Sequence, residues 1–186
     1  TIMAPPPNKL LSIVQKIHKA GLPDRLQQAA LSLAFNSQIK YAGTTGIRIH
    51  QWQQDQAIVS LKNRRHIQNH IGGIHATAMA TLAESATGMI FGLHVPDTHV
   101  PLLKSMKVHF VARASGDLTA VATLSQEQQE IIQTTDRGSL IVPVKVTDSE
   151  GKEPIQCEME WAWTTKTKKQ PPSSSSSSSS QPQSKL

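Results

Sequence analysis

The chain has 186 residues, a net charge of +6 and one cysteine, Cys157. A lone cysteine excludes an internal disulfide, which fits an intracellular compartment better than a small secreted scaffold. No apolar run reaches the ~18–20 residues of a membrane-spanning helix. The basic residues lack interleaved aromatic residues and a recognition motif, so we do not expect nucleic-acid binding.

Residues 1–45 predict a Pro-rich leader followed by a pair of helices. Apolar residues recur at helical spacing between residues 10 and 17, Asn8 is a plausible N-cap, and Gly21 ends this first helix. Asp24 can cap a second helix that extends to about Phe35.

Residues 46–165 predict an α+β domain in which one long helix packs on a mainly antiparallel sheet of five or six strands. The helix is expected from about Ile74 to Gly92, roughly 28 Å long at 1.5 Å per residue. A short helix or bulged loop is expected at residues 126–132. The expected strands are residues 47–52, 57–61, 100–111, 118–124, 139–147 and 155–165.

Residues 166–186 predict a disordered Lys/Pro/Ser-rich tail, because such a composition cannot bury enough apolar area to offset its ordering entropy. The tail ends in Ser184-Lys185-Leu186, the string that the peroxisomal import receptor reads at a free carboxyl terminus. We therefore expect the peroxisomal matrix as the location and that receptor as a partner. The alternative is a chance ending on a cytosolic protein.

The segment from Asn69 to Glu84 combines a polar loop, a glycine pair, a helix start and one carboxylate inside an apolar helix. Partial burial would raise the pKa of Glu84 and make it a candidate base. Simpler interpretations remain open for each residue. Glu84 would then sit on a solvated helix edge, His75 would satisfy a helix N-terminus, and Asn69 would cap a loop.

The spacing Asn69-x5-His75-x8-Glu84 resembles the active-site motif of PaaI-like hotdog thioesterases, which include the 4-hydroxybenzoyl-CoA thioesterase type. That family has His-Gly-Gly where this chain has His75-Ala76-Thr77. Residues 102–114 and 144–163 also resemble the family, so the resemblance covers roughly residues 46–165. It implies a hotdog fold, a homodimer or tetramer, and a site shared between protomers.

The resemblance implies an acyl-CoA thioesterase of lipid metabolism, which hydrolyses an acyl thioester to free acid and coenzyme A. Glu84 would act as general base or nucleophile, facing the partner's helix start. The amide of Ala76, with that of His75 as a second candidate, would form an oxyanion hole. Asn69 would orient water or the thioester, and His75 would support the loop. Substrate contacts are expected from Gly73, Lys62, Arg64 and Arg65, the basic ones toward coenzyme A phosphates; no metal or other cofactor is required.

Two other functions stay open. A non-catalytic hotdog module that binds an acyl ligand or only dimerises is supported by Ala76 in the place of the family glycine. A hotdog enoyl-CoA hydratase or dehydratase ranks third, because its Asp-x4-His motif has no convincing copy in the chain. A serine hydrolase is not favoured, since the Gly-x-Ser-x-Gly elbow is absent.

Overall fold

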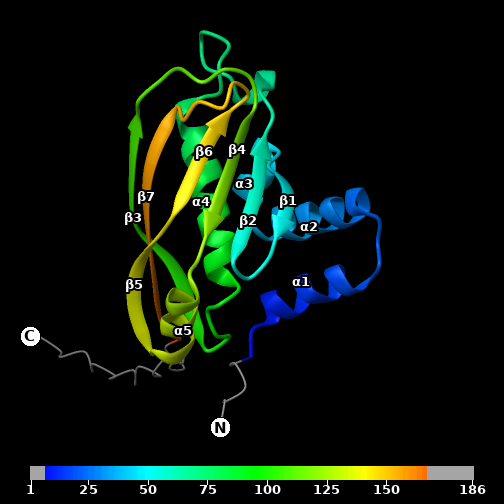
Figure 1. The fold of residues 1–186 in the computed structure, drawn as a ribbon, viewed down its shortest axis with the longest axis vertical. Coiled ribbons are helices and arrows are strands. Elements are labelled where there is room, and N and C mark those ends of the chain that lie inside the picture. Colours follow the sequence, from blue (N-terminus) through cyan, green and yellow to red (C-terminus); the bar gives the residue numbers. More distant parts are fainter. Residues whose placement is uncertain (1–6, 167–186) are drawn as a thin grey trace, which may run out of the picture.

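A computed structural model describes residues 7–166 (Figure 1); the predicted targeting tripeptide Ser184–Leu186 lies outside them. The helices are α1 (Lys9–Lys19), α2 (Asp24–Gln38), α3 (Lys40–Thr45), the 3-10 helix η1 (Arg65–Ile67), α4 (Ala76–Gly92) and α5 (Gln126–Thr134). The strands are β1 (Arg48–Trp52), β2 (Gln56–Leu61), β3 (His99–Phe110), β4 (Leu118–Thr123), β5 (Arg137–Val142), β6 (Val144–Asp148) and β7 (Ile155–Thr165). None of the helices in residues 7–166 combines the length and apolar character needed to cross a membrane.

The strands form two antiparallel sheets that share one helix. The first has the order β1-β2-β4-β6 and the second the order β3-β7-β5. Helix α4 contacts strands of both sheets and runs along them in Figure 1. Its residues Leu82, Ala86 and Ile90 are fully buried at this contact. The predicted α+β architecture, with the long helix on the sheet, is confirmed.

The long helix begins two residues later than predicted, at Ala76 rather than Ile74. Ile74 forms an isolated antiparallel bridge with Gln68, which requires extended backbone. His75 is the N-cap, also extended, so the first helical residue is Ala76. The apolar Ile74 fits the helical period but is buried as part of the preceding loop.

The predicted single strand at residues 139–147 is two strands in different sheets. β5 ends at Val142 in the second sheet, and β6 begins at Val144 in the first. Pro143 stands between them and has no amide hydrogen to donate to a ladder. The predicted alternation of faces is nevertheless right, since Val142 and Val146 are buried while Lys145 is exposed.

The N-terminal helical pair is present, and it is longer than predicted. α2 continues beyond Phe35 to Gln38, and the short α3 follows, which the sequence patterns did not predict. Asn8 caps α1 as expected, with its Oδ1 accepting from the amide of Leu11 at 2.8 Å. Residues 126–134 are a helix, α5, because Ser125 and Gln128 form a reciprocal capping box.

Candidate active site

Glu84 projects from α4 into a cavity of about 610 Å³. The side chain is half-buried, and burial raises the pKa of its carboxyl above the usual 4.5. A long hydrogen bond from Ser85 Oγ to Oε2, 3.4 Å, opposes this rise only weakly. Glu84 makes no ion pair with any residue in the range 7–166. The carboxylate is therefore not on a solvated helix edge.

The cavity around Glu84 is mostly apolar and is built from distant parts of the chain. Leu10 and Ile13 come from α1, Phe35 from α2, Leu102 from β3 and Trp161 from β7. Among the described residues that line it, Glu84 is the sole ionisable one. None of these wall residues was identified from the sequence, because the helical and strand periods do not say which faces meet.

The loop before α4 is organised by Asn69. Its Oδ1 accepts from the amides of Ile71 and Gly73, both at 3.1 Å. Gly72 supplies the left-handed turn that this arrangement needs, with φ of 77°. The side-chain oxygen of Asn69 is thus committed to the loop, and the Nδ2 amino group is what remains for a substrate.

His75 caps the start of α4, as the simpler interpretation held. Its Nδ1 accepts from the amide of Thr77 at 3.2 Å and lies 2.8 Å from the Thr77 hydroxyl. Its own amide donates to the carbonyl of Ile67 at 2.8 Å. The prediction of His75 as a second oxyanion donor is therefore wrong, because that hydrogen is already bonded. Within residues 7–166, no acceptor contacts the amides of Ala76 or Ala78.

A polar cleft of about 430 Å³ lies in front of this helix start. Tyr41 and Thr44 of α3 line it together with His66, His75 and Thr77. The predicted basic residues are exposed on the loop that leads to Asn69 and line neither the cleft nor the Glu84 cavity; they are Lys62, Arg64 and Arg65.

The two halves of the predicted site do not meet within one chain. Ala76 and Glu84 are about eight residues apart on a straight helix, which is roughly 12 Å. Glu84 lines the apolar cavity, whereas the neighbours of Ala76 in the chain, His75 and Thr77, line the polar cleft. A single protomer therefore presents the carboxylate and the free amide as separate features.

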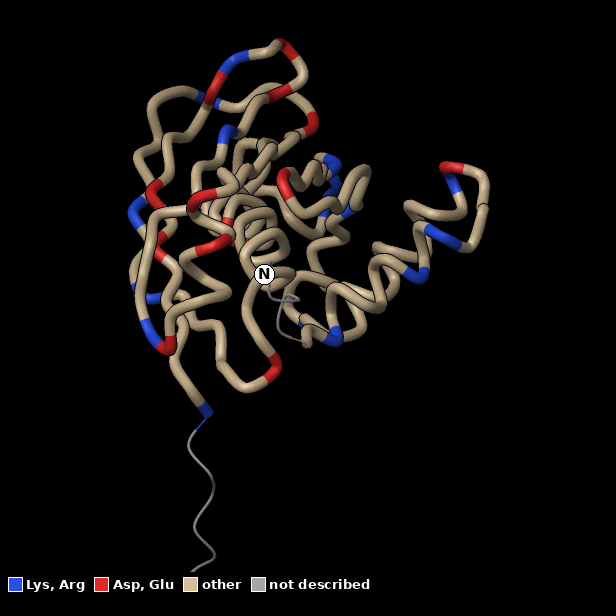
Figure 2. Tube along the Cα trace, turned by 60° about the horizontal axis from the view of Figure 1, so that its bottom comes forward, with Lys and Arg blue, Asp and Glu red and all other residues tan. Residues whose placement is uncertain are grey.

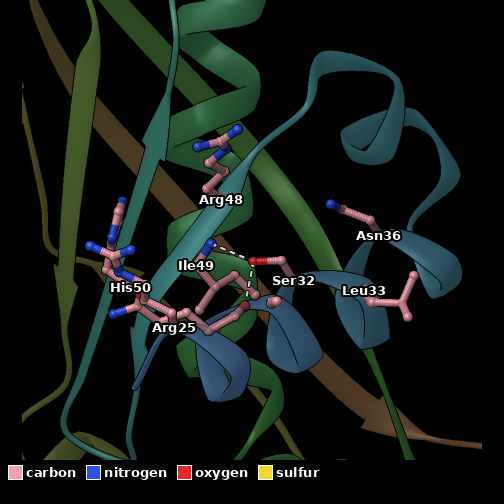
Figure 3. A pocket seen from close by; sticks show the side chains of 9 residues that line it. Arg25, Ser32, Leu33, Asn36, Arg48, Ile49 and His50 are labelled. Atoms are coloured by element: carbon pink, nitrogen blue, oxygen red, sulfur yellow. Dashed lines mark hydrogen bonds between the residues drawn. The ribbon is translucent and has the colours of Figure 1, made fainter. Parts of the chain in front are cut away.

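A third hollow, of about 620 Å³, lies between α2 and β1 (Figure 3). Arg25, Arg48 and His50 line it, and Ser32 Oγ accepts from the amide of Ile49 at 2.9 Å. The α2 residues that line this groove and the α2 residues that line the Glu84 cavity lie on opposite faces of the helix. This groove contains none of the predicted site residues.

Comparison with known proteins places the chain in a family. The model of a domain of unknown function, DUF4442, matches residues 27–163. The chain belongs to the DUF4442 family. No curated protein matches this DUF4442 chain.

Solved structures resemble this DUF4442 protein in fold. A probable thioesterase of Pseudomonas aeruginosa is 21% identical with a TM-score of 0.67, covering 78% of this chain and 97% of its own. A mutant thioesterase of the same species is 18% identical with a TM-score of 0.59, and the match covers 72% of this chain and 94% of the other. A Haemophilus influenzae thioesterase is 14% identical with a TM-score of 0.60, and the match covers 74% of this chain and 90% of the other. At this identity the likeness shows the fold alone, which is the hotdog fold.

Proposed function

We propose that this DUF4442 protein is an acyl-CoA thioesterase. The observation that carries the proposal is Glu84, a half-buried carboxylate with a raised pKa in an otherwise apolar cavity. A carboxylate whose pKa is moved toward the working pH is a better general base than one in water. The fold is one in which proteins named as thioesterases occur.

The proposed site is completed by a second copy of the chain. Ala76 lies too far from Glu84 along α4 to act with it in the same protomer. Strand β3 is at the edge of its sheet and exposes Leu102, Met106 and Phe110, which suits pairing with another subunit. In such a dimer, Glu84 of one protomer would face the partner subunit's Ala76.

In the proposed reaction, Glu84 removes a proton from water, and the resulting hydroxide attacks the thioester carbonyl. Negative charge on the carbonyl oxygen is stabilised by the free amide of Ala76 and the positive end of the α4 dipole. The carbon–sulfur bond then breaks, and the departing coenzyme A thiolate takes the proton that Glu84 removed from water. In the alternative route Glu84 itself attacks the carbonyl and expels the coenzyme A thiolate, and water then hydrolyses the resulting anhydride to release the acid and regenerate Glu84. Asn69 Nδ2 is the group that would orient the water or the thioester.

The substitution Ala76→Pro tests the amide donor with little effect on the helix. Proline lacks the N–H, and the first helical position is where it is best tolerated. His75, which precedes it, already has the extended backbone that proline requires, with φ of −63° and ψ of 143°. We expect Ala76→Pro and Glu84→Ala each to lower kcat at least about 10²-fold. Ala76→Gly, which keeps the N–H, is the matched control.

Mixing the two inactive variants tests whether the site is shared. Ala76→Pro and Glu84→Ala chains, refolded together in equal amounts, form mixed dimers with one intact site. Activity should then recover to about a quarter of the wild-type value, because half of the dimers are mixed and each has one working site of two. No recovery in a mixture shown to contain mixed dimers would exclude the shared site. Turnover by Glu84→Ala within a few-fold of wild type would exclude the mechanism.

The second candidate function is a non-catalytic module that binds acyl ligands. It is favoured by Ala76, whose methyl group restricts the backbone where the resembling family has glycine. Equilibrium binding of acyl-CoA without turnover over all chain lengths would support it. For the coenzyme A phosphates we propose the exposed basic loop with Lys62, Arg64 and Arg65.

For the location we propose the peroxisomal matrix, with the import receptor as a partner. This proposal is supported by the terminal string Ser184-Lys185-Leu186 alone.

A further inference from the structure

Helix α1 forms one wall of the cavity that holds Glu84, although α1 lies before the residues that the DUF4442 family model matches. Leu10, Ile13 and Val14 line the cavity. They precede residue 27, where the DUF4442 match begins. The lysines of α1 are exposed. Figure 2 shows basic residues along the part of the chain that extends away from the sheets. α1 therefore turns its apolar side to the cavity and its charged side to water.

Both ends of α1 are attached to the hotdog body. Near its start, Asn8 Nδ2 donates to the carbonyls of Gly92 at 2.9 Å and Val95 at 2.7 Å. Near its end, His18 Nε2 is hydrogen-bonded to the carbonyl of Trp52 at 2.9 Å. These bonds tie α1 to the C-terminal end of α4 and to β1. The wall is thus held in one position rather than resting loosely on the surface.

The close contact between α1 and α4 depends on a glycine, Gly92. A Cβ atom built on Gly92 would lie 3.2 Å from Leu10 Cδ2, which is tighter than an ordinary contact. Leu10 therefore packs directly against the α4 backbone, and both Leu10 and Gly92 line the cavity at this contact.

We infer that the cavity takes the hydrocarbon chain of an aliphatic acyl thioester and that α1, through Leu10, sets the accepted chain length. This inference rests on the proposed function, because the thioester carbon is positioned at Glu84. The size of the cavity, about 610 Å³, is within the roughly 300–1,000 Å³ of small-molecule sites. Apart from Glu84, the polar groups in its lining are uncharged, so a hydrocarbon displaces little bound water from them.

Binding of non-hydrolysable thioether analogues of acyl-CoA tests the inference without turnover. For saturated chains of about four to about sixteen carbons, each methylene that enters the cavity should tighten binding about fourfold, up to a plateau where the cavity is full. Affinity that is independent of chain length would overturn the inference, whether or not the protein hydrolyses thioesters. Chain-length-dependent binding with no turnover would instead overturn the proposed function alone.

The paired variants Leu10→Ala and Leu11→Ala test the role of α1. Both leucines are partly buried on the same helix, but Leu10 lines the cavity and Leu11 does not. Leu10→Ala should move the plateau to longer chains by at least about two carbons, and Leu11→Ala should leave it in place. Identical profiles in the two variants would show that α1 does not limit the chain.

A second pair of variants, on α2, tests the effect of a narrower cavity. Ala34 lines the cavity, whereas Ala29 lies in the groove on the opposite face of this helix. Ala34→Phe should weaken binding of the longest chains at least about tenfold and change the shortest less than about threefold, since added volume excludes the distal carbons first. Ala29→Phe should change neither. Equal loss for all chain lengths in Ala34→Phe, with an unchanged Tm, would contradict the placement of the chain.

Discussion

The indole N–H of Trp161 donates to the hydroxyl of Thr87 at 2.9 Å, inside the contact between β7 and α4. The same hydroxyl lies 2.9 Å from the carbonyl oxygen of Glu84 and 3.0 Å from that of Ala83. Trp161 is also a wall of the Glu84 cavity. One buried hydroxyl therefore links the wall of the cavity to the backbone that carries the proposed base.

Thr87→Val is expected to lower the free energy of unfolding by about 1–3 kcal/mol, because it leaves the buried Trp161 N–H without an acceptor while keeping the side-chain volume. Urea unfolding followed by tryptophan fluorescence measures this. Thr87→Ser keeps the hydroxyl and is the control. A urea midpoint of Thr87→Val equal to that of the wild type would show that the hydrogen bond contributes nothing.

Gly88→Ala is expected to destabilise the fold through steric overlap. The added Cβ would lie 2.8 Å from Cη2 and Cζ2 of Trp161, a buried ring that its hydrogen bond to Thr87 holds in place. Overpacking of this kind costs about 1–3 kcal/mol. Thermal unfolding should show a lower Tm for Gly88→Ala than for Gly73→Ala, whose added Cβ meets nothing closer than 3.6 Å. In a Trp161→Phe background the effect of Gly88→Ala should shrink.

Glu84→Gln is expected to abolish turnover and to stabilise the protein at neutral pH. Burial raises the pKa of Glu84, so the folded state holds this proton more tightly than the unfolded state. The stability that this gives the wild type is complete below the usual value of 4.5 and is lost as the pH rises through the raised pKa. Glutamine does not titrate. The Tm of Glu84→Gln should therefore exceed that of the wild type by a few degrees at neutral pH, and the two should converge near pH 4. A gap that is constant with pH would contradict this.

Asp148→Asn should show the opposite pH dependence. The Asp148 carboxylate accepts from the amides of Ser115 at 3.0 Å, Glu150 at 2.9 Å and Lys152 at 2.9 Å. These bonds, the one from Ser115 foremost, hold the pKa of Asp148 below its usual 3.8. Its stabilisation is present above that value and is lost as the pH falls through the lowered pKa. Urea midpoints should place Asp148→Asn below the wild type at neutral pH, with the difference shrinking toward pH 2–3. Lys145→Arg, a change on the exposed face of β6 that keeps the charge facing Glu153, is the control.

Import into peroxisomes should depend on the last residue. A fluorescent protein fused ahead of Thr1, with Leu186 as the free carboxyl terminus, is expected in peroxisomes. Deleting Leu186 should leave the fusion in the cytosol. Gln183→Asp, just before the tripeptide, should not change the import. A peroxisomal signal that survives the deletion would contradict the proposed address.

The sequence alone determined the elements whose signals are local. Asn8 caps the helix that begins one residue after it, and the two-residue alternation around Val142 and Val146 assigns the buried face without any distant partner. The spacing of Asn69, His75 and Glu84 likewise identified a loop, a helix start and a helical carboxylate. Each of these signals depends only on residues a few positions away, and covalent connection keeps such residues close together whatever the rest of the chain does.

Only the tertiary structure decided what these elements meet. Pro143 divides one apparent strand between two sheets, and the amide of His75 is taken by Ile67 rather than left for a substrate. Leu10 and Trp161, about 150 residues apart, line one cavity with Glu84. Such contacts form because distant apolar surfaces pack where their shapes fit and buried polar groups pair with whatever partner that packing brings close, and neither outcome is encoded in a local repeat.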